Sequence, residues 1–195
     1  MACHFFCDTG VIRGKCDPKD IHYESCSFFF KKYPINLNRY NVCETVIEEL
    51  NYHKSNLISK ANRVMGTVEY TYYRSIEQQI DLCIRKITKF NCNDHGASRI
   101  RDRSLLINDL ETVIGAYTLS LRNDIKIVAN SIIWSCLTGD EENILLTVDY
   151  RNLIKNYTEI KEVAEYCLTD DFNLLMLNMP DYCEYRLFLD EFEDL

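Results

Sequence analysis

The chain has 195 residues, a net charge of −8 and an apolar fraction of 47%. That apolar content fills a substantial core and excludes wholesale disorder. Because no run of 18 apolar residues occurs, we expect no membrane span. The N-terminus lacks the basic and apolar segments of a signal peptide. We therefore expect a soluble, cytoplasmic protein, in the host cytoplasm if the protein is viral.

The charge is distributed unevenly along the chain. Residues 1–40 carry six Lys/Arg and four Asp/Glu, whereas residues 140–195 carry four Lys/Arg and fifteen Asp/Glu. A nucleic-acid surface needs local positive charge rather than a basic protein overall. We expect such a surface in the front two-thirds only. The acidic last third is then predicted to face a basic protein partner or to keep RNA at the front of the molecule.

The first 26 residues contain four side chains of the kinds that bind zinc. They follow one another with eight, five and three intervening residues: Cys7, Cys16, His22 and Cys26. Zinc takes thiolate and imidazole ligands in a tetrahedron and can hold a short segment that lacks its own core. Cys3 and His4 could replace one of these ligands. The alternative is that these cysteines pack as ordinary buried thiols.

Apolar residues at helical spacing follow the N-terminal segment almost to the end of the chain. The helix expected over 37–62 has a stripe narrow enough for a coiled-coil seam, which would make a homo-oligomer, but it also suits a core helix. Further helices are expected over 76–87, 104–117, 121–137, 142–168 and 182–192, with a loop at 91–96.

The predicted fold is therefore mainly α. A small N-terminal zinc-binding segment would precede an all-α helical core of about five to seven helices. The predicted organisation is a zinc-finger-like segment over 1–33, a helical oligomerisation or linking region over 34–98, and an all-α core domain with an acidic C-terminal part over 99–195.

The Cys/His spacing and the run Ile12-Arg13-Gly14-Lys15-Cys16 resemble Cys3His zinc fingers. Residues 102–104 and 117–126 add a second, weaker similarity. Together they resemble the pneumovirus and filovirus zinc-finger transcription antitermination and activation factors. That resemblance implies an RNA-binding transcription regulator with a helical body that docks a phosphoprotein or nucleoprotein. His22 and Cys26 stand in the reverse of the family's order, which zinc tolerates because it does not rank ligand positions.

Such a finger would bind RNA through aromatic rings that stack on bases and basic residues that contact phosphates. Phe28 could instead help to dock the finger on the first helix. The candidate RNA contacts are Arg13, Lys15, Lys19, Tyr23, Phe28, Lys31, Lys32, Arg99, Arg101 and Arg103.

No catalytic motif is recognisable in the sequence. Gly-rich phosphate loops, Gly-x-Ser-x-Gly and His-Glu-x-x-His are absent, and paired acids such as Glu48-Glu49 are interpreted as solvated surface. We therefore expect a protein that is not an enzyme. The alternative to the regulator is an all-α adaptor that binds a host signalling protein, like the poxviral Bcl-2-like inhibitors of innate immune or apoptotic signalling, with no nucleic-acid role.

Overall fold

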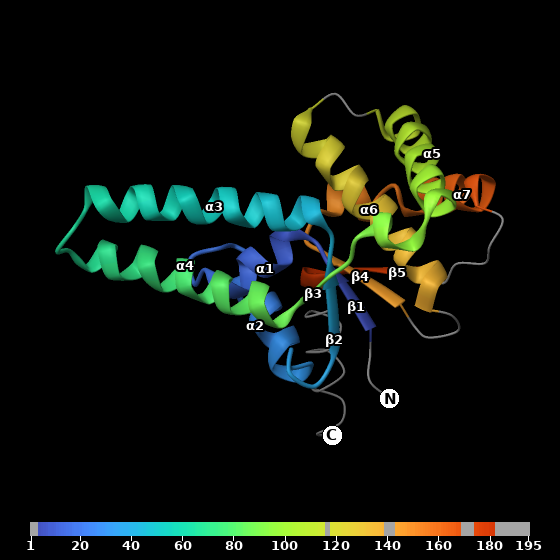
Figure 1. Ribbon diagram of the computed structural model, residues 1–195. Coiled ribbons are helices and arrows are strands. Elements are labelled where there is room, and N and C mark those ends of the chain that lie inside the picture. The colour runs from blue at the N-terminus through green and yellow to red at the C-terminus, as the bar shows by residue number, and fades with distance from the viewer. Residues whose placement is uncertain (1–3, 116–117, 139–142, 169–173, 182–195) are drawn as a thin grey trace, which may run out of the picture.

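A five-stranded parallel sheet lies at the centre of the molecule (Figure 1). The computed structural model describes residues 4–115, 118–138, 143–168 and 174–181. The strands lie side by side in the order β3-β2-β1-β4-β5, and every neighbouring pair is parallel. Their bounds are β1 (His4–Cys7), β2 (Arg39–Val42), β3 (Thr88–Lys89), β4 (Asn143–Thr147) and β5 (Leu174–Asn178).

The central strand, β1, is buried along its whole length. Phe5 pairs with Ile144 of β4 and Cys7 pairs with Leu146. A strand that is covered on both faces needs apolar residues at successive positions rather than in alternation. The run His4–Cys7 meets that need, because Phe5 and Phe6 point to opposite faces and both are buried.

Helices cover the sheet and extend beyond it at one side. A hairpin made of α3 and α4, which we call the arm, projects from the body, while α5, α6 and α7 gather on the other side (Figure 1). The helical elements are α1 (Thr9–Cys16), α2 (Tyr23–Lys32), α3 (Glu44–Arg63), α4 (Val68–Lys86), η1 (Cys92–His95), α5 (Ala97–Ile114), α6 (Leu119–Thr138), η2 (Tyr150–Ile154) and α7 (Tyr157–Cys167).

The arm accounts for the apolar stripe that the sequence shows over 37–62. Leu50, Leu57 and Ala61 of α3 are buried, and α3 makes its most extensive packing with α4. Ile76 and Ile80 supply the matching face of α4. Burying side chains of this size contributes about 1.5–3 kcal/mol each. The stripe is therefore used within the chain, as the core-helix alternative expected, and the homo-oligomer stays a prediction.

The α6 helix is the most deeply buried of the helices in the described part of the chain. Its residues from Ile127 to Ser135 are all buried. Trp134 of α6 packs against Phe6 of β1, with ring centroids 5.5 Å apart. A helix that is apolar on all sides belongs in an interior position. That position brings the first turns of α6 to the end of β1, where the candidate site lies.

The predicted helices are confirmed in part, but the expectation of an all-α protein is wrong. Residues 142–168, predicted as one helix, instead contain β4, η2 and α7. The sheet takes strands from 1–33, from 34–98 and from 99–195 alike, and the N-terminal segment supplies its central strand. The predicted helix at 182–192 lies outside the described residues. Among the described helices, none has the length and apolar character needed to cross a membrane.

Candidate functional site

Two aspartates follow the carboxyl ends of the neighbouring strands β1 and β4. Asp8 comes directly after β1, and Asp149 comes two residues after β4. The chain runs outward from β1 to β2 and β3 and then crosses back to β4 on the other side. In parallel sheets, ligands bind where the strand order reverses in this way, beyond the carboxyl ends of the strands.

Two helices add a carboxylate each to this edge of the sheet. Glu49 comes from the second turn of α3, and Asp124 comes from the first turns of α6. Both Glu49 oxygens are held, because Thr9 Oγ1 donates to Oε2 at 2.6 Å and Asn123 Nδ2 donates to Oε1 at 2.7 Å. The position of Glu49 is therefore fixed by residues that themselves adjoin Asp8 and Asp124.

Hydrogen bonds also orient the two strand-end aspartates. Thr147 Oγ1 donates to Asp8 Oδ2 at 3.0 Å and accepts from the backbone N–H of Asp149. Asn152 donates to Asp149 twice, from its backbone N–H at 3.0 Å and from Nδ2 at 2.7 Å. A single threonine thus links both aspartates, and each carboxylate keeps lone pairs that these bonds do not use.

Burial and the charge of neighbouring acids change the ionisation of two of the four carboxylates, Asp124 and Asp8. Burial raises the pKa of Asp124 to about 8, with further increases from the charges of Asp8, Asp149 and Glu49. Burial also raises the pKa of Asp8 to about 6, against the lowering effect of its hydrogen bond from Thr147. Carboxylates that share a site cannot all ionise freely. The site accordingly holds either protons or a cation.

A groove of 860 Å³ opens onto these side chains, and we call it the carboxylate groove. Arg13, His53 and Tyr52 line it alongside the four acids. Burial, followed by the charge of Arg13, lowers the pKa of His53. The wall is closely packed at Gly10, where a Cβ atom would lie 2.4 Å from Cγ2 of Val148.

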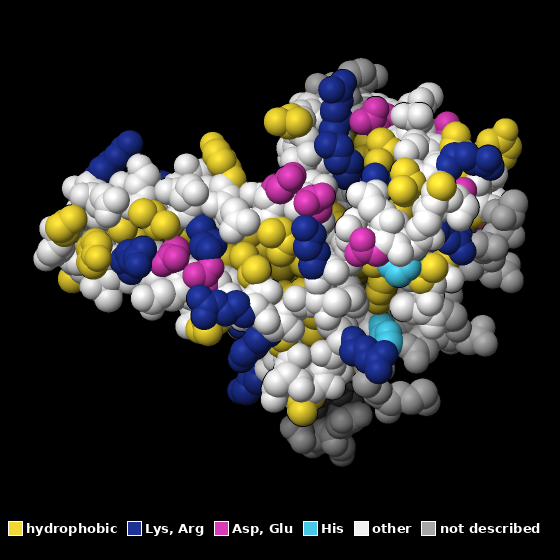
Figure 2. Space-filling view, in the orientation of Figure 1, with side chains coloured by type: hydrophobic (Ala, Val, Ile, Leu, Met, Phe, Trp, Pro, Cys, Tyr) yellow, Lys and Arg dark blue, Asp and Glu magenta, His cyan; other side chains and the backbone are white. Residues whose placement is uncertain are grey.

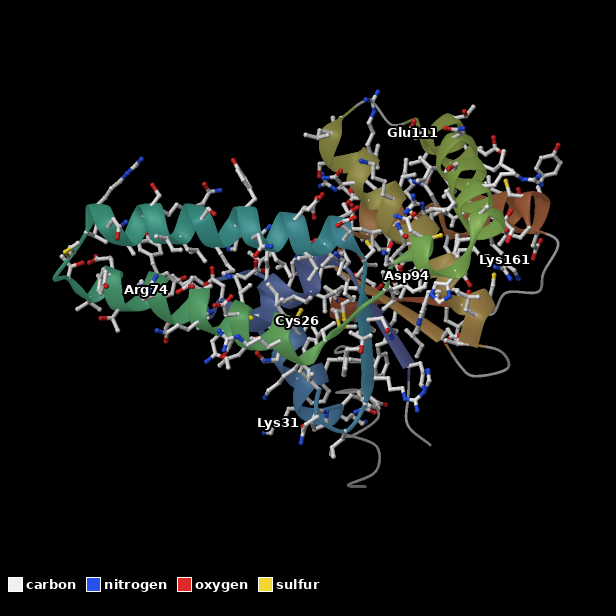
Figure 3. The ribbon with its side chains drawn as sticks, in the orientation of Figure 1. Cys26, Lys31, Arg74, Asp94, Glu111 and Lys161 are labelled. Atoms are coloured by element: carbon white, nitrogen blue, oxygen red, sulfur yellow. The ribbon has the colours of Figure 1, made fainter. Side chains whose placement is uncertain are left out.

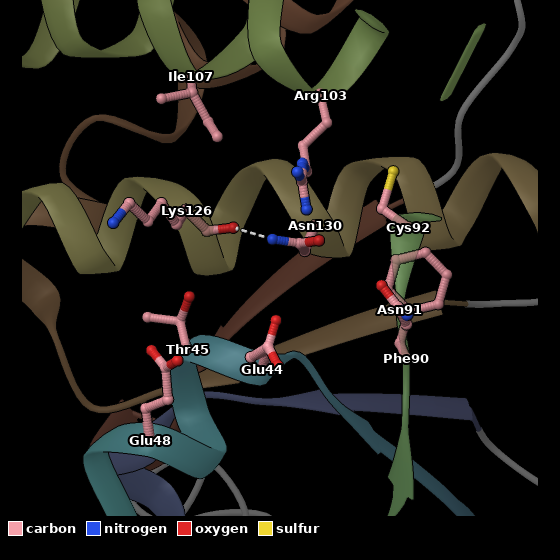
Figure 4. Close-up of a pocket in the computed structure, with 10 residues that line it drawn as sticks. All are labelled: Glu44, Thr45, Glu48, Phe90, Asn91, Cys92, Arg103, Ile107, Lys126 and Asn130. Carbon is pink, nitrogen blue, oxygen red and sulfur yellow. Dashed lines mark hydrogen bonds between the residues drawn. The ribbon is translucent and has the colours of Figure 1, made fainter. Parts of the chain in front are cut away.

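A smaller pocket of 180 Å³ lies beside the groove and shares Glu48 with it. Arg103 descends into it from α5, above Asn130 of α6, and Glu44 faces it from α3 (Figure 4). Arg103 Nε is buried without a hydrogen-bond partner in the described structure. Figure 2 shows acidic side chains where the arm meets the body, with Lys and Arg side chains close by. Acidic and basic side chains therefore lie close together where the groove and the pocket adjoin.

The carboxylate groove has the donor chemistry of a magnesium or manganese site. Within the described residues, no three His, Cys, Asp or Glu side chains already converge on one ion position. Magnesium does not require such a cage, because it keeps several waters and binds through one or two carboxylates together with substrate phosphates. Asp8 and Asp124 could supply these one or two carboxylates once they lose their protons.

One solved structure shares this architecture. It is the crystal structure of VapBC2 from Rickettsia felis bound to a DNA fragment from its promoter, with a TM-score of 0.53 and 15% sequence identity. The match covers 89% of this chain and 97% of the other chain. At this identity the similarity shows the fold alone. No family model matches the chain, and no curated protein matches it.

The predicted zinc ligands lie on elements of the core rather than in a separate finger. Cys7 is in β1, Cys16 ends α1 and Cys26 is in α2, and all three are buried. His22 precedes α2 and its backbone N–H bonds to Asp20. Burial raises the pKa of Cys26 to about 12, which favours the thiol over the thiolate that zinc needs. These residues do not form a metal-binding group in the described structure. Zinc binding itself stays a prediction.

The predicted RNA contacts are distributed over several surfaces. Arg13 lies in the carboxylate groove and Arg103 in the adjoining pocket. Lys19 packs over the ring of Tyr72, with Nζ 4.3 Å from the centroid. The others lie elsewhere: Lys15, Tyr23 and Lys31 line a pocket between α1, α2 and α4, Phe28 is half-buried, Lys32 is exposed, Arg99 pairs with Asp102, and Arg101 is exposed on α5.

The four groove carboxylates were not among the predicted site residues. Glu48 is exposed, as expected of solvated surface, whereas its neighbour Glu49 is half-buried and bonded at both oxygens. Asp8 and Asp149 each follow a short apolar run, Phe5-Phe6-Cys7 and Ile144 to Val148. An acid at the end of such a run is the signal that could have found them, provided that the runs are recognised as parallel strands.

Proposed function

We propose that this protein is a divalent-metal-dependent phosphodiesterase that hydrolyses nucleic acid in the carboxylate groove. The observation that carries the proposal is that Asp8, Glu49, Asp124 and Asp149 line one groove at the carboxyl ends of β1 and β4. Ionised carboxylates that lie close together repel one another and destabilise the folded state. A bound cation removes that repulsion. This proposal departs from the sequence-based expectation of a non-enzymatic regulator.

The reaction is the attack of water on a phosphodiester, in which a new P–O bond forms and the bond to the leaving oxygen breaks. Magnesium would supply Lewis-acid polarisation of the phosphate and of the water. Asp8 and Asp124 would hold the cation, and Thr147 and Asn152 would keep Asp8 and Asp149 oriented toward it. A groove carboxylate accepts the proton of the attacking water, a role suited to a pKa near neutral pH.

Nucleic acid is the substrate class that the surroundings favour. The groove is open rather than enclosed, so a chain can lie along it. Arg13 lies within it, and Arg103 with Lys126 lines the adjoining pocket, where a flanking phosphate would meet positive charge. The similar solved structure contains a protein bound to DNA. RNA is the first substrate to test, since the sequence pattern of basic and aromatic residues predicts RNA binding.

A cleavage assay with a labelled RNA strand and the DNA strand of the same sequence tests the proposal. We expect cleavage with Mg²⁺ or Mn²⁺ that chelation abolishes and that metal restores. Asp8→Asn and Asp149→Asn should each lower kcat/KM by more than about 100-fold, because even outer-shell changes at metal sites cost about 10–100-fold.

Glu165→Gln is the matched control, because Glu165 is exposed on α7, lies outside the groove lining and pairs with Lys161 at 3.7 Å. Its activity should equal that of the wild type. Cleavage that persists unchanged in Asp8→Asn would trace the activity to a contaminating nuclease and overturn the proposal. The regulator and adaptor functions stay predictions from the sequence.

A further inference from the structure

Four cysteines from four elements lie around α1, three of them from the first 26 residues and one from the arm. They are Cys7 of β1, Cys16 of α1, Cys26 of α2 and Cys83 of α4, and all four are buried. Figure 3 shows Cys26 at the point where the arm joins the body. Cys16 and Cys83 form the closest pair, with their Sγ atoms 3.7 Å apart. We call these two the dithiol pair.

Two lysine side chains lie in the same pocket as Cys83. Cys83 lines a pocket of 220 Å³ together with Lys15 and Lys86. Its hydrogen bond with Cys16, followed by the charges of Lys15 and Lys86, lowers the pKa of Cys83 in spite of burial, while the same hydrogen bond raises the pKa of Cys16. Burial, followed by the charges of neighbouring groups, raises the pKa values of Cys7 and Cys26. A cysteine near lysines is the one that ionises and reacts.

Both sulfur atoms adjoin space that opens to the surface. Cys83 is reached through the 220 Å³ pocket, and Cys16 lines a neighbouring pocket of 520 Å³ that also contains Lys15 and Lys31. The side chains themselves are only 3% and 4% exposed. Access is therefore limited to a small reagent, and a large substrate such as a protein disulfide is excluded.

We propose that Cys16 and Cys83 form a peroxide-reactive site in which Cys83 is the attacking thiol and Cys16 the resolving thiol. The Cys83 thiolate attacks one oxygen of a hydroperoxide, the O–O bond breaks, and the departing oxygen takes a proton to leave as water or an alcohol. Cys83 is thereby oxidised to a sulfenic acid. The Cys16 sulfur then attacks the Cys83 sulfur, the S–O bond breaks, and water leaves as the disulfide forms.

The disulfide would tie α1 to the arm. Its S–S bond of about 2.05 Å is shorter than the present 3.7 Å between the sulfur atoms, so the cysteine side chains must rotate or the two helices must approach one another. Asp8 immediately precedes α1, and α4 packs along α3, which carries Glu49. The bond would thus join α1, which directly follows Asp8, to the arm, which carries Glu49 on its other helix. The inference stands on the dithiol pair alone and does not depend on the proposed hydrolysis.

The test oxidises the full-length reduced protein with hydrogen peroxide, blocks the remaining thiols with maleimide and maps the peptides by mass spectrometry. We expect a Cys16–Cys83 disulfide to form before any other cysteine is oxidised. In Cys16→Ser the reaction should stop at a Cys83 sulfenic acid that dimedone traps. Cys26→Ser is the matched control, since it removes a buried neighbour and should leave the disulfide intact.

A second variant keeps both thiols and does not depend on a cysteine replacement that might fail to fold. Lys15→Gln should slow oxidation of Cys83 at neutral pH by roughly 3–10-fold, because less of the thiol is ionised. Oxidation of Cys83 no faster than that of Cys43 would overturn the proposal. Zinc that copurifies with the chain and protects Cys16 and Cys83 from peroxide would overturn it too, in favour of a metal site.

Discussion

The carboxylate groove and the dithiol pair adjoin opposite ends of the same short helix, α1, and different interactions hold their side chains together. Asp8 precedes α1 and Cys16 ends it. At the first end, charged groups are held close together and repel. At the second end, sulfur atoms fill space among apolar side chains. Under the proposed function the groove takes a metal ion, whereas the cysteines are already buried in the core. Metal is thus expected at the acids rather than at the cysteines, where the sequence placed it.

The largest expected effect comes from neutralising Asp124, whose pKa is raised by burial and by all three other groove acids. Asp124→Asn should lower metal-dependent kcat/KM by more than about 100-fold. The same change should raise thermal stability in the absence of metal at and above about pH 8, because it removes a charge that burial and the neighbouring acids disfavour. Cleavage kinetics and thermal melts of the same preparations check both effects. A variant that loses activity and also loses stability would indicate a structural role for Asp124 rather than a metal-binding one.

At the cysteine end, the helix packs too closely to admit one methyl group. A Cβ atom at Gly14 would lie 2.8 Å from Cys26 Sγ and 3.4 Å from His22 Cβ. Gly14→Ala should therefore destabilise the protein by about 1–3 kcal/mol, less the helix propensity that alanine gains. The free energy of unfolding measured in denaturant gives this value.

Adding Cys26→Ala to Gly14→Ala should recover most of the loss, because the sulfur atom that clashes is gone. The two changes would then show a favourable coupling in a double-mutant cycle. If Cys26 holds zinc instead, the double variant should be less stable than either single variant, and zinc content should fall with it.

The groove should also make stability depend on pH in a defined direction. The pKa values of Asp8 and Asp124 are raised above their ordinary value of 3.8, to about 6 and about 8. The native protein therefore binds protons more tightly than the unfolded chain between about pH 4 and pH 8, so that stability falls as the pH rises through this window. Because the groove is partly solvated, the loss should be smaller than the pKa shifts imply, about 1–2 kcal/mol.

Thermal melts of the wild type and Asp124→Asn in chelator, from pH 5 to pH 8.5, check this prediction. The wild type should lose several degrees relative to the variant as the pH rises. Millimolar Mg²⁺ at pH 8 should restore the wild type and leave Asp124→Asn unchanged, since a ligand stabilises only the state that binds it. Equal pH profiles for the two proteins would contradict the repulsion on which the groove depends.

The sequence predicted the long helices and missed the sheet for the same physical reason. The stripe of Val46, Leu50, Leu57 and Ala61 extends over about four helical turns, so its period is unambiguous. The strands are two to five residues long and β1 is buried at every position, so they show no alternation that would separate them from helix. Without the sheet, nothing connects Asp8 with Asp149 across 141 positions.

The candidate site was beyond sequence reasoning for that reason, yet part of the cysteine pattern was informative. Cys7, Cys16 and Cys26 do come together around the base of α1, but Cys83 from the arm joins them and His22 does not form a ligand group with them. Local spacing finds residues that share a segment. It cannot find a partner that tertiary packing supplies from 57 residues further along the chain.

The smallest expected effect distinguishes the predicted RNA contacts that lie in the groove from those that do not. Arg13 lines the groove, is 45% exposed and lies 3.9 Å from Asp20, a loose contact. Arg13→Gln should raise the KM for RNA several-fold. It should also reduce the slope of log binding constant against log salt concentration by about one, as the loss of one phosphate contact does. Lys19→Gln is the matched control, because Lys19 packs on Tyr72 away from the acids. Equal effects of the two changes would mean that RNA follows the basic residues of the first 33 positions, as the zinc-finger resemblance implies. An effect confined to Arg13 would place the RNA along the carboxylates.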